Sequence, residues 1–264
     1  TDELPQSSAG RTIMTTEPKF VPEKAADIVL DNQTKLNVRL VDCVGYIVPS
    51  SLGYIENEAP RMVKTPWFED EIPFNMAAEI GTQKVIKEHA TIGLVITSDG
   101  SISEIPRDEY EEAEERVVNE LKEINKPFIV LLNCMYPQSA AVISLAKELE
   151  EKYNVPVVPV NCLHITEDEI KNILTKVLFE FPLKKVVIKL PSWLKGLDAD
   201  SDFKKNLISD IKSSSDNLRK MRELECFTAS LCECQDVVYS NIERIHLGDG
   251  TAFVKADIDN RIFY

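Results

Sequence analysis

The sequence lacks any long apolar run, and none of its hydrophobic stretches approaches the length of a membrane span. The first residues, Thr1–Pro5, have neither the basic start nor the apolar stretch of a signal peptide. We therefore expect a protein of the cytoplasm. The chain also lacks an initial Met, and its last residues, Asn260–Tyr264, carry no terminating signal, which predicts a fragment of a longer protein.

Cysteine pairs and an excess of positive charge are also missing. The six cysteines include no Cys-x-x-Cys pair, so neither a disulfide framework nor a zinc site is expected. Three of them, Cys43, Cys134 and Cys162, lie in or at the ends of apolar strands, where we expect reduced thiols of the core. With 44 acidic residues against 30 basic ones the net charge is −14, and no nucleic-acid partner is expected.

The strongest functional pattern is the stretch Leu36–Gly45. Apolar and polar residues alternate in it, which predicts a half-buried strand, and after a strand over 26–30 it predicts the second arm of a hairpin. The strand ends in Asp42-x-x-Gly45, the arrangement of a metal site in nucleoside triphosphatases. There the Asp holds magnesium, usually through water, and the Gly N–H meets the terminal phosphate. The alternative is that Asp42 and Gly45 only form a turn.

The segment 43–73 has no clean period, and prolines interrupt every possible helix. A loop of this length inside a compact domain is usually functional or disordered. One hypothesis is a switch or partner-binding surface. The other is an insertion that packs Trp67 and Phe68 onto the domain.

Apolar strands then alternate with amphipathic helices, which predicts an α/β fold with a doubly wound, mostly parallel sheet. The expected helices cover 74–89, 108–124, 140–153 and the residues after Thr166, and the expected strands cover 91–97, 128–132 and 155–160. Capping boxes are predicted at Asp108/Glu111 and at Thr166/Glu169.

Ligands of such sheets bind outside the carboxyl ends of the strands. Asp42, Thr97, Asn133 and Asn161 all fall at or near that rim. Among them we expect Asp42 to hold a metal and Asn133 to contact a nucleotide.

The pattern changes beyond Pro182, where a small α+β unit is expected. It contains a strand over 185–190, a long helix over 202–223, and strands over 237–246 and 251–258. The predicted domains are therefore 1–182 and 183–264.

Two nucleotide-binding motifs are absent. None of the nine glycines starts a G-x-x-x-x-G-K-[ST] phosphate loop, which argues against an active enzyme in this chain alone. A guanine site would carry Asn-Lys-x-Asp after the 128–132 strand, but the residues are Asn133-Cys134-Met135-Tyr136. Guanine selectivity therefore has no obvious source, and a plain GTPase is disfavoured.

Long segments resemble the stage IV sporulation protein A family, the ATPases of the spore-coat base, which are related to translation-factor-type GTPases. The resemblance is dense to about residue 130 and thinner afterwards. The similar segments are 2–7, 12–20, 39–46, 60–62, 65–67, 77–85, 112–117, 180–182 and 190–193.

The resemblance implies a P-loop-NTPase-like ATPase domain, with ATP and Mg2+ as cofactors. Thr15 and Thr16 would be the switch threonines, one of which binds magnesium and senses the terminal phosphate. Asp42 would be the Walker B carboxylate, and Gly45 the switch glycine at the nucleotide. The family's phosphate loop would precede Thr1, so we expect this chain alone to be inactive.

The resemblance also implies where the intact protein works and what it binds. It would polymerise with its own copies on the forespore surface, in the cytoplasm of the mother cell, and seed assembly of the spore coat. Its partners would be spore-coat morphogenetic proteins and a small amphipathic membrane-anchoring protein. The alternative is a non-catalytic scaffold that keeps the fold and binds coat partners through the segment 43–73.

Overall fold

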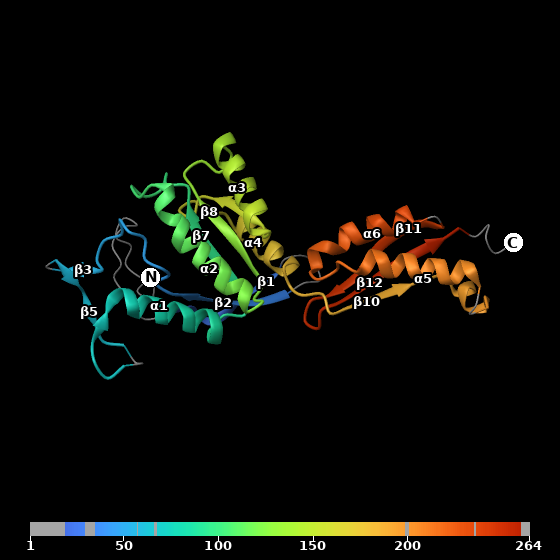
Figure 1. Cartoon of the computed structure of the whole chain (residues 1–264), viewed down its shortest axis with the longest axis horizontal. Helices are drawn as coiled ribbons and strands as arrows, with labels where there is room; N and C mark the ends of the chain where they lie inside the picture. Colours follow the sequence, from blue (N-terminus) through green and yellow to red (C-terminus); the bar gives the residue numbers. More distant parts are fainter. Residues whose placement is uncertain are drawn as a thin grey trace. The chain divides into compact units, whose positions relative to one another are not determined.

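The chain divides into two compact units, Thr1–Val177 and Leu178–Tyr264, and each is described by itself. The computed structural model describes residues 19–29, 35–56, 58–65, 68–198, 201–234 and 236–259, and Figure 1 shows its helices and strands. In these ranges no helix is long and apolar enough to cross a membrane.

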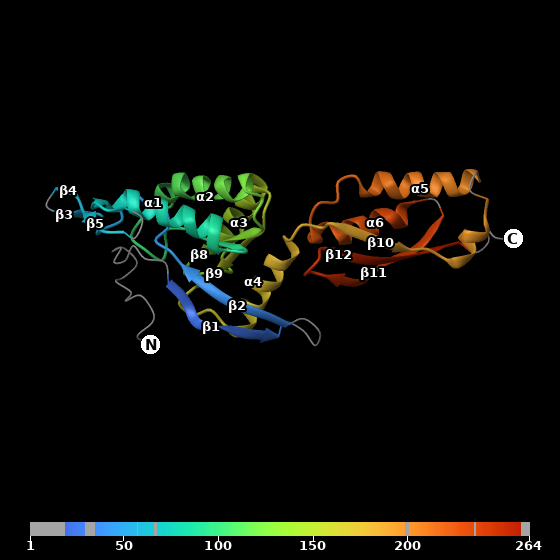
Figure 2. The ribbon, with the colours of Figure 1, turned by 90° about the horizontal axis from the view of Figure 1, so that it is seen from below.

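A long antiparallel hairpin carries the Asp-x-x-Gly strand. β1 (Lys19–Val29) pairs with β2 (Lys35–Asp42), and Asp42 lies opposite Lys19 at the end of the ladder. Figure 2 shows the two strands side by side. The predicted hairpin is confirmed, although its first strand begins earlier than expected.

The segment after the hairpin contains four very short strands. They form two antiparallel pairs, β3 (Ile55–Glu56) with β4 (Ala59–Pro60) and β5 (Met62–Val63) with β6 (Ile72–Pro73). Phe68 is 42% exposed, which contradicts the hypothesis that it packs onto the domain, and Trp67 lies outside the described residues.

A three-stranded parallel sheet forms the centre of the first unit. Its strands are β7 (Gly93–Ser98), β8 (Phe128–Asn133) and β9 (Val157–Val160), in the order β7-β8-β9. Parallel strands require crossover connections, and the helices between them supply these. The predicted α/β class with a parallel sheet is confirmed.

Helices cover this sheet on two sides. The helical segments are α1 (Phe74–Lys84), the π-helix η1 (Val85–His89), the 3-10 helix η2 (Arg107–Tyr110), α2 (Glu111–Glu123), α3 (Ala140–Tyr153) and α4 (Glu167–Phe179). Figure 2 shows α2 and α3 on one side and α4 on the other. The core on the α2–α3 side includes Val118, Leu121, Val130 and Val142.

One predicted capping box is confirmed and the other is wrong. Thr166 and Glu169 exchange both bonds, because the Thr166 N–H donates to the Glu169 carboxylate (2.8 Å) and the Glu169 N–H donates to the Thr166 hydroxyl (3.3 Å). At the other site the chain first forms the 3-10 turn η2, and Tyr110, which precedes α2, makes no side-chain cap bond. Asp108 therefore lies inside a helical turn instead of capping one.

The second unit is a small α+β fold, as predicted. β10 (Lys185–Lys189) and β11 (Val237–His246) flank the central β12 (Thr251–Ile258), the first parallel and the second antiparallel to it. Its helical segments are η3 (Ser192–Gly196), α5 (Asp202–Ser215), η4 (Met221–Glu223) and α6 (Leu224–Glu233). The expected single helix over 202–223 is wrong, because the chain turns after Asp216 and starts a second helix.

Both helices of the second unit pack on one face of its sheet. Leu207 from α5 packs with Ala256 and Ile258, whereas Leu231 from α6 packs with Val254. The three β12 residues are two apart in sequence, so they share a face of the strand.

A buried carboxylate links three elements of the first unit. Glu114 on α2 is only 3% exposed. Arg107 contacts both of its carboxylate oxygens at 2.8 Å, and the Tyr153 hydroxyl from α3 donates to it at 2.7 Å. Arg107 also donates to the Thr97 hydroxyl at the end of β7 (3.0 Å). Removing one partner of a buried ion pair is costly, because the other charge is then left buried without a counter-ion.

We predict that Glu114→Gln lowers the free energy of unfolding of the first unit by about 3 kcal/mol at pH 7, because Arg107 keeps its buried charge without a counter-ion. Urea unfolding followed by circular dichroism measures this. Glu112→Gln, in the same helix but exposed, is the matched control and should change stability by less than about 0.5 kcal/mol. Equal effects of the two substitutions would contradict the buried pair.

The pH dependence of the same carboxylate is a separate test. Burial raises the pKa of Glu114, but hydrogen bonds from Arg107, Thr97 and Tyr153 outweigh it and hold the pKa below its ordinary value. A carboxyl group with a lowered folded pKa stabilises the fold above its unfolded pKa, and this stabilisation disappears as the pH falls through the folded pKa. Acidification below the ordinary value of 4.5 should therefore destabilise the wild type more steeply than Glu114→Gln.

Candidate functional site

The predicted metal ligand lies where the hairpin ends. Asp42 is the last residue of β2, and its side chain is exposed. Gly45 follows on the same loop with a φ of +79°, in the left-handed region that favours glycine. Nothing lies within 4 Å of the position that a Cβ of Gly45 would take, so the backbone conformation, and not the packing, requires glycine here.

The loop after Asp42 is docked on α1. The Gly45 N–H donates to the Thr82 hydroxyl at 3.1 Å, and Thr82 is buried at 3% exposure. Burial raises the pKa of the neighbouring Cys43 thiol, although contacts with Gly45 and Thr82 act in the opposite direction. The thiol is therefore held in its protonated form at neutral pH, and the loop residues pack as part of the domain.

Tyr46 fixes the next position of the loop on α2. Its hydroxyl donates to the Glu120 carboxylate, and the Arg116 guanidinium lies over its ring, 4.3 Å from the centroid. Burial and the Glu120 carboxylate both raise the pKa of Tyr46 well above its ordinary value. Arg116 is held in turn by Glu79 of α1 at 2.9 Å. Tyr46 therefore lies against a charged cluster that joins α1 to α2.

The carboxyl rim of the parallel sheet carries a second polar group of residues. The Asn133 side-chain oxygen accepts the Cys162 N–H at 3.1 Å, and the Asn161 side chain donates to the Met135 carbonyl at 3.3 Å. These bonds join the loops after β8 and β9. The expectation of core thiols is confirmed for Cys134, which is buried, and is wrong for Cys162, which is exposed because it lies in the rim loop beyond the strand.

The loop after β7 joins the same rim. The Ser101 hydroxyl donates to the Asp99 carboxylate (2.6 Å) and accepts the Met135 N–H (2.9 Å). Thr97, Asn133 and Asn161 thus lie at the strand ends, as their positions in the sequence indicate.

The structure brings some of the predicted site residues together and not others. Asp42 and Gly45 share one loop, and Asn133 lies at the rim of the parallel sheet. Thr15 and Thr16 lie outside the described residues. In the described part of the chain, no hydrogen bond or ion pair joins Asp42 to Asn133, so the two form separate parts of a candidate site.

The donor set suits one kind of metal binding. Magnesium in nucleotide sites is commonly held by one or two carboxylates together with phosphate oxygens and water. Asp42 offers one exposed carboxylate, and the described ranges contain no group of three or more His, Cys, Asp or Glu residues that could hold a metal ion. The residues therefore fit an ion that binds together with a nucleotide, and not an ion held by protein ligands alone.

The sequence analysis missed Thr82, Arg116 and Glu120. Thr82 has a signal, because it follows Ala77, Ala78 and Gly81 on the buried face of α1, where a polar residue is unusual. Arg116 and Glu120 have no comparable signal, since exposed and half-buried charges are common along helices.

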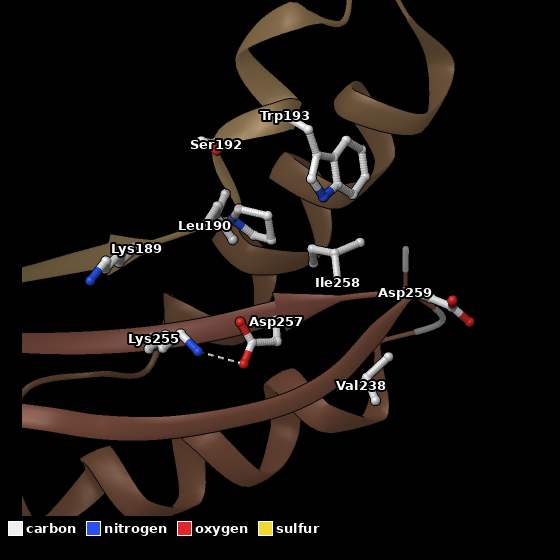
Figure 3. Close-up of a pocket in the computed structure, with 10 residues that line it drawn as sticks. Lys189, Leu190, Ser192, Trp193, Val238, Lys255, Asp257, Ile258 and Asp259 are labelled. Atoms are coloured by element: carbon white, nitrogen blue, oxygen red, sulfur yellow. Dashed lines mark hydrogen bonds and ion pairs between the residues drawn. The ribbon is translucent and has the colours of Figure 1, made fainter. Parts of the chain in front are cut away.

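The second unit has a surface groove of its own. Figure 3 shows its lining, in which Lys255 pairs with Asp257 at 2.7 Å and Trp193 comes from the turn after β10. Lys189 and Asp259 complete the charged lining. Because two lysines and two aspartates line the groove, it has no net charge with which to attract an ion.

Comparison with known proteins identifies the family. A family model described as stage IV sporulation protein A, ATPase domain, matches residues 1–182, and one described as stage IV sporulation protein A, middle domain, matches residues 183–264. The chain belongs to the stage IV sporulation protein A family. The resemblance given by the sequence is confirmed, and the family names support a role in sporulation and an ATPase activity in the family.

Relatives match along the chain but extend beyond it. Stage IV sporulation protein A of Bacillus anthracis is 45% identical over 251 residues, which are 95% of this chain and 51% of the relative. That of Clostridioides difficile is 43% identical over 263 residues, 100% of this chain and 54% of the relative. The chain thus spans about half the length of the curated relatives it matches. No solved structure shows a significant match.

We predict that Asn133→Ala loosens the rim, because the Cys162 N–H loses its acceptor. Hydrogen exchange of the peptide 161–165 should become about three- to tenfold faster, as expected for one lost hydrogen bond. Asn133→Asp keeps an acceptor oxygen and should exchange like the wild type. Equal acceleration in both variants would show that the bond does not hold this loop.

Proposed function

We propose that the full-length protein hydrolyses ATP and assembles with its own copies on the forespore surface, where it forms the base of the spore coat. The observation that carries the proposal is the exposed Asp42 carboxylate at the end of β2, with Gly45 on the same loop, inside a domain that matches the family's ATPase model. A strand-end carboxylate for the metal, followed by a glycine whose N–H can meet the terminal phosphate, suits this part of a site for phosphoryl transfer from ATP.

The roles of the chain's own residues follow from their chemistry. When bound, magnesium would neutralise charge on the transferred phosphoryl group. Asp42 would hold the ion through its carboxylate, and Gly45 would donate its N–H to the terminal phosphate. Thr15 and Thr16 would supply the switch hydroxyls, and Asn133 would contact the nucleotide from the sheet rim.

The phosphate-binding loop would come from sequence outside this chain. Two observations support a further element beside the hairpin and the sheet. Ile96 on β7 is 61% exposed and Leu40 on β2 is 51% exposed, although both lie in strands. In the described ranges β7 pairs only with β8 and β2 only with β1, so each keeps one unpaired edge. Apolar residues on unpaired strands favour the addition of another strand.

The proposed partners are second copies of the protein, spore-coat morphogenetic proteins and a small amphipathic membrane-anchoring protein, and the proposed location is the cytoplasm of the mother cell. The segment after the hairpin supports partner binding. Its apolar side chains Leu52, Ile55, Met62 and Phe68 are 42 to 56% exposed. Exposed apolar side chains mark an interaction surface where they form one contiguous patch, and the proposal requires this of the segment.

The same surface supports the second candidate function, a non-catalytic scaffold that binds coat partners. The two functions differ in their need for nucleotide. Assembly by an ATPase depends on ATP with magnesium, whereas assembly by a scaffold does not.

We predict that Asp42→Ala in the full-length protein reduces ATP hydrolysis at least about a hundredfold, because the metal loses its carboxylate ligand. Polymer that can be pelleted should be lost in parallel. Phosphate release and sedimentation with ATP and magnesium measure the two effects. Asp27→Ala, on the other strand of the hairpin and also exposed, is the matched control and should hydrolyse and assemble normally.

Persistence of both hydrolysis and assembly in Asp42→Ala would make Asp42 a turn residue. Assembly of the wild type without any nucleotide would favour the scaffold.

A further inference from the structure

The loop that follows Asp42 is anchored at three points, one on each of three helical segments. The Gly45 N–H donates to Thr82 of α1, and the Tyr46 hydroxyl donates to Glu120 of α2. Farther along, the Ser50 backbone N–H and hydroxyl donate to the Glu109 carboxylate of η2 at 2.7 and 2.6 Å. The loop is thus held in one position by specific hydrogen bonds.

Gly45 has one backbone donor, and in this position the donor is in use. Its N–H lies 3.1 Å from the Thr82 hydroxyl oxygen, and Thr82 is buried, so water does not readily replace this acceptor. The space beside the Gly45 Cα is open, as nothing lies within 4 Å of a Cβ built there. A ligand can therefore approach the glycine backbone, but it meets an N–H that already donates elsewhere.

We propose that Thr82 is a positioning residue that holds the Asp42–Gly45 loop in the position described above, and that it competes with the terminal phosphate of ATP for the Gly45 N–H. The inference rests on the proposed function, in which Gly45 donates to that phosphate. Because one N–H makes one strong hydrogen bond at a time, binding of the phosphate requires release of Thr82. Thr82 thereby weakens nucleotide binding by the free energy of its own hydrogen bond to Gly45, which must be broken first.

Tyr46 extends the consequence of this release to the helices. Its ring lies under Arg116 and its hydroxyl on Glu120, whereas Arg116 also pairs with Glu79 of α1. A shift of Gly45 displaces its neighbour Tyr46, and through Tyr46 it disturbs the cluster that joins α1 to α2. The state of the nucleotide is in this way transmitted to the surface of two helices.

The test compares Thr82→Val with Thr82→Ser in the full-length protein. Valine has nearly the shape of threonine but no acceptor, whereas serine keeps the hydroxyl. Without nucleotide, hydrogen exchange of the peptide 43–48 should be faster in Thr82→Val. With magnesium and a non-hydrolysable ATP analogue, Thr82→Val should bind about three- to tenfold more tightly than the wild type, the range expected for one competing hydrogen bond. Thr82→Ser should match the wild type in both measurements.

Unchanged exchange and affinity in Thr82→Val, or equal changes in Thr82→Val and Thr82→Ser, would overturn the inference. Tyr46→Phe provides a second test if Thr82→Val does not fold. It removes only the hydroxyl, and with it the hydrogen bonds to Glu120 and Gln83, so it should also speed exchange of the loop and tighten binding. An unchanged Tyr46→Phe variant would count against the inference. A wild-type protein that binds no ATP analogue would refute the proposed function itself, and the inference with it.

Discussion

The parallel pairing of β7, β8 and β9 is the constraint on which most of the first unit depends. Parallel neighbours cannot be joined by a tight turn, so a helix must return the chain along the sheet after each strand. Two successive crossovers in the same direction place α2 and α3 on one face, where they pack against each other as well as on the strands. The bond between Tyr153 and Glu114 joins these two helices, and it exists because the crossovers bring them together. The same pairing aligns the strand ends, so that Thr97, Asn133 and Asn161 share one rim.

Buried charge recurs in both units and follows one physical rule. Glu114 is matched by Arg107 in the first unit, and Glu180 is matched by Lys220 at 2.6 Å and Arg222 at 3.1 Å in the second. Each carboxylate is almost fully buried and would be strongly destabilising if it were alone. In a chain with net charge −14 the scarcer basic side chains are thus placed where an unpaired carboxylate would cost most.

The periodicity of apolar residues in the sequence predicted the helices and strands whose burial is regular. It failed where a single contact between distant residues determines the structure. The alternation in 36–41, the apolar strands and the boundaries of α3 and β12 follow from one residue pattern repeated over several positions. The burial of Glu114 was not predicted, because a carboxylate on a helix is expected to be exposed to solvent unless its partners are known. Its partner Tyr153 lies far away in the sequence. The break between α5 and α6 was not predicted, because no glycine or proline lies there. Ile96 lies in one of the predicted apolar strands but is 61% exposed, because an outer strand leaves part of its apolar face uncovered.

The sequence predicted the candidate metal ligand, Asp42, but not the hydrogen bonding of the Gly45 N–H. An Asp at a strand end and a Gly three residues later can be recognised in the sequence because their spacing is local. Whether the Gly45 N–H is available depends on Thr82, which is 37 positions away, and only the packing of α1 against the loop brings the two together. With the proposed exchange of the Thr82 hydroxyl for a phosphate oxygen as the acceptor, the loop has two alternative bonding states, and two such states are what a switch needs. Since Tyr46 is fixed to α2 while Gly45 is fixed to α1, neither helix can be displaced without affecting the loop, and the loop cannot move without affecting both.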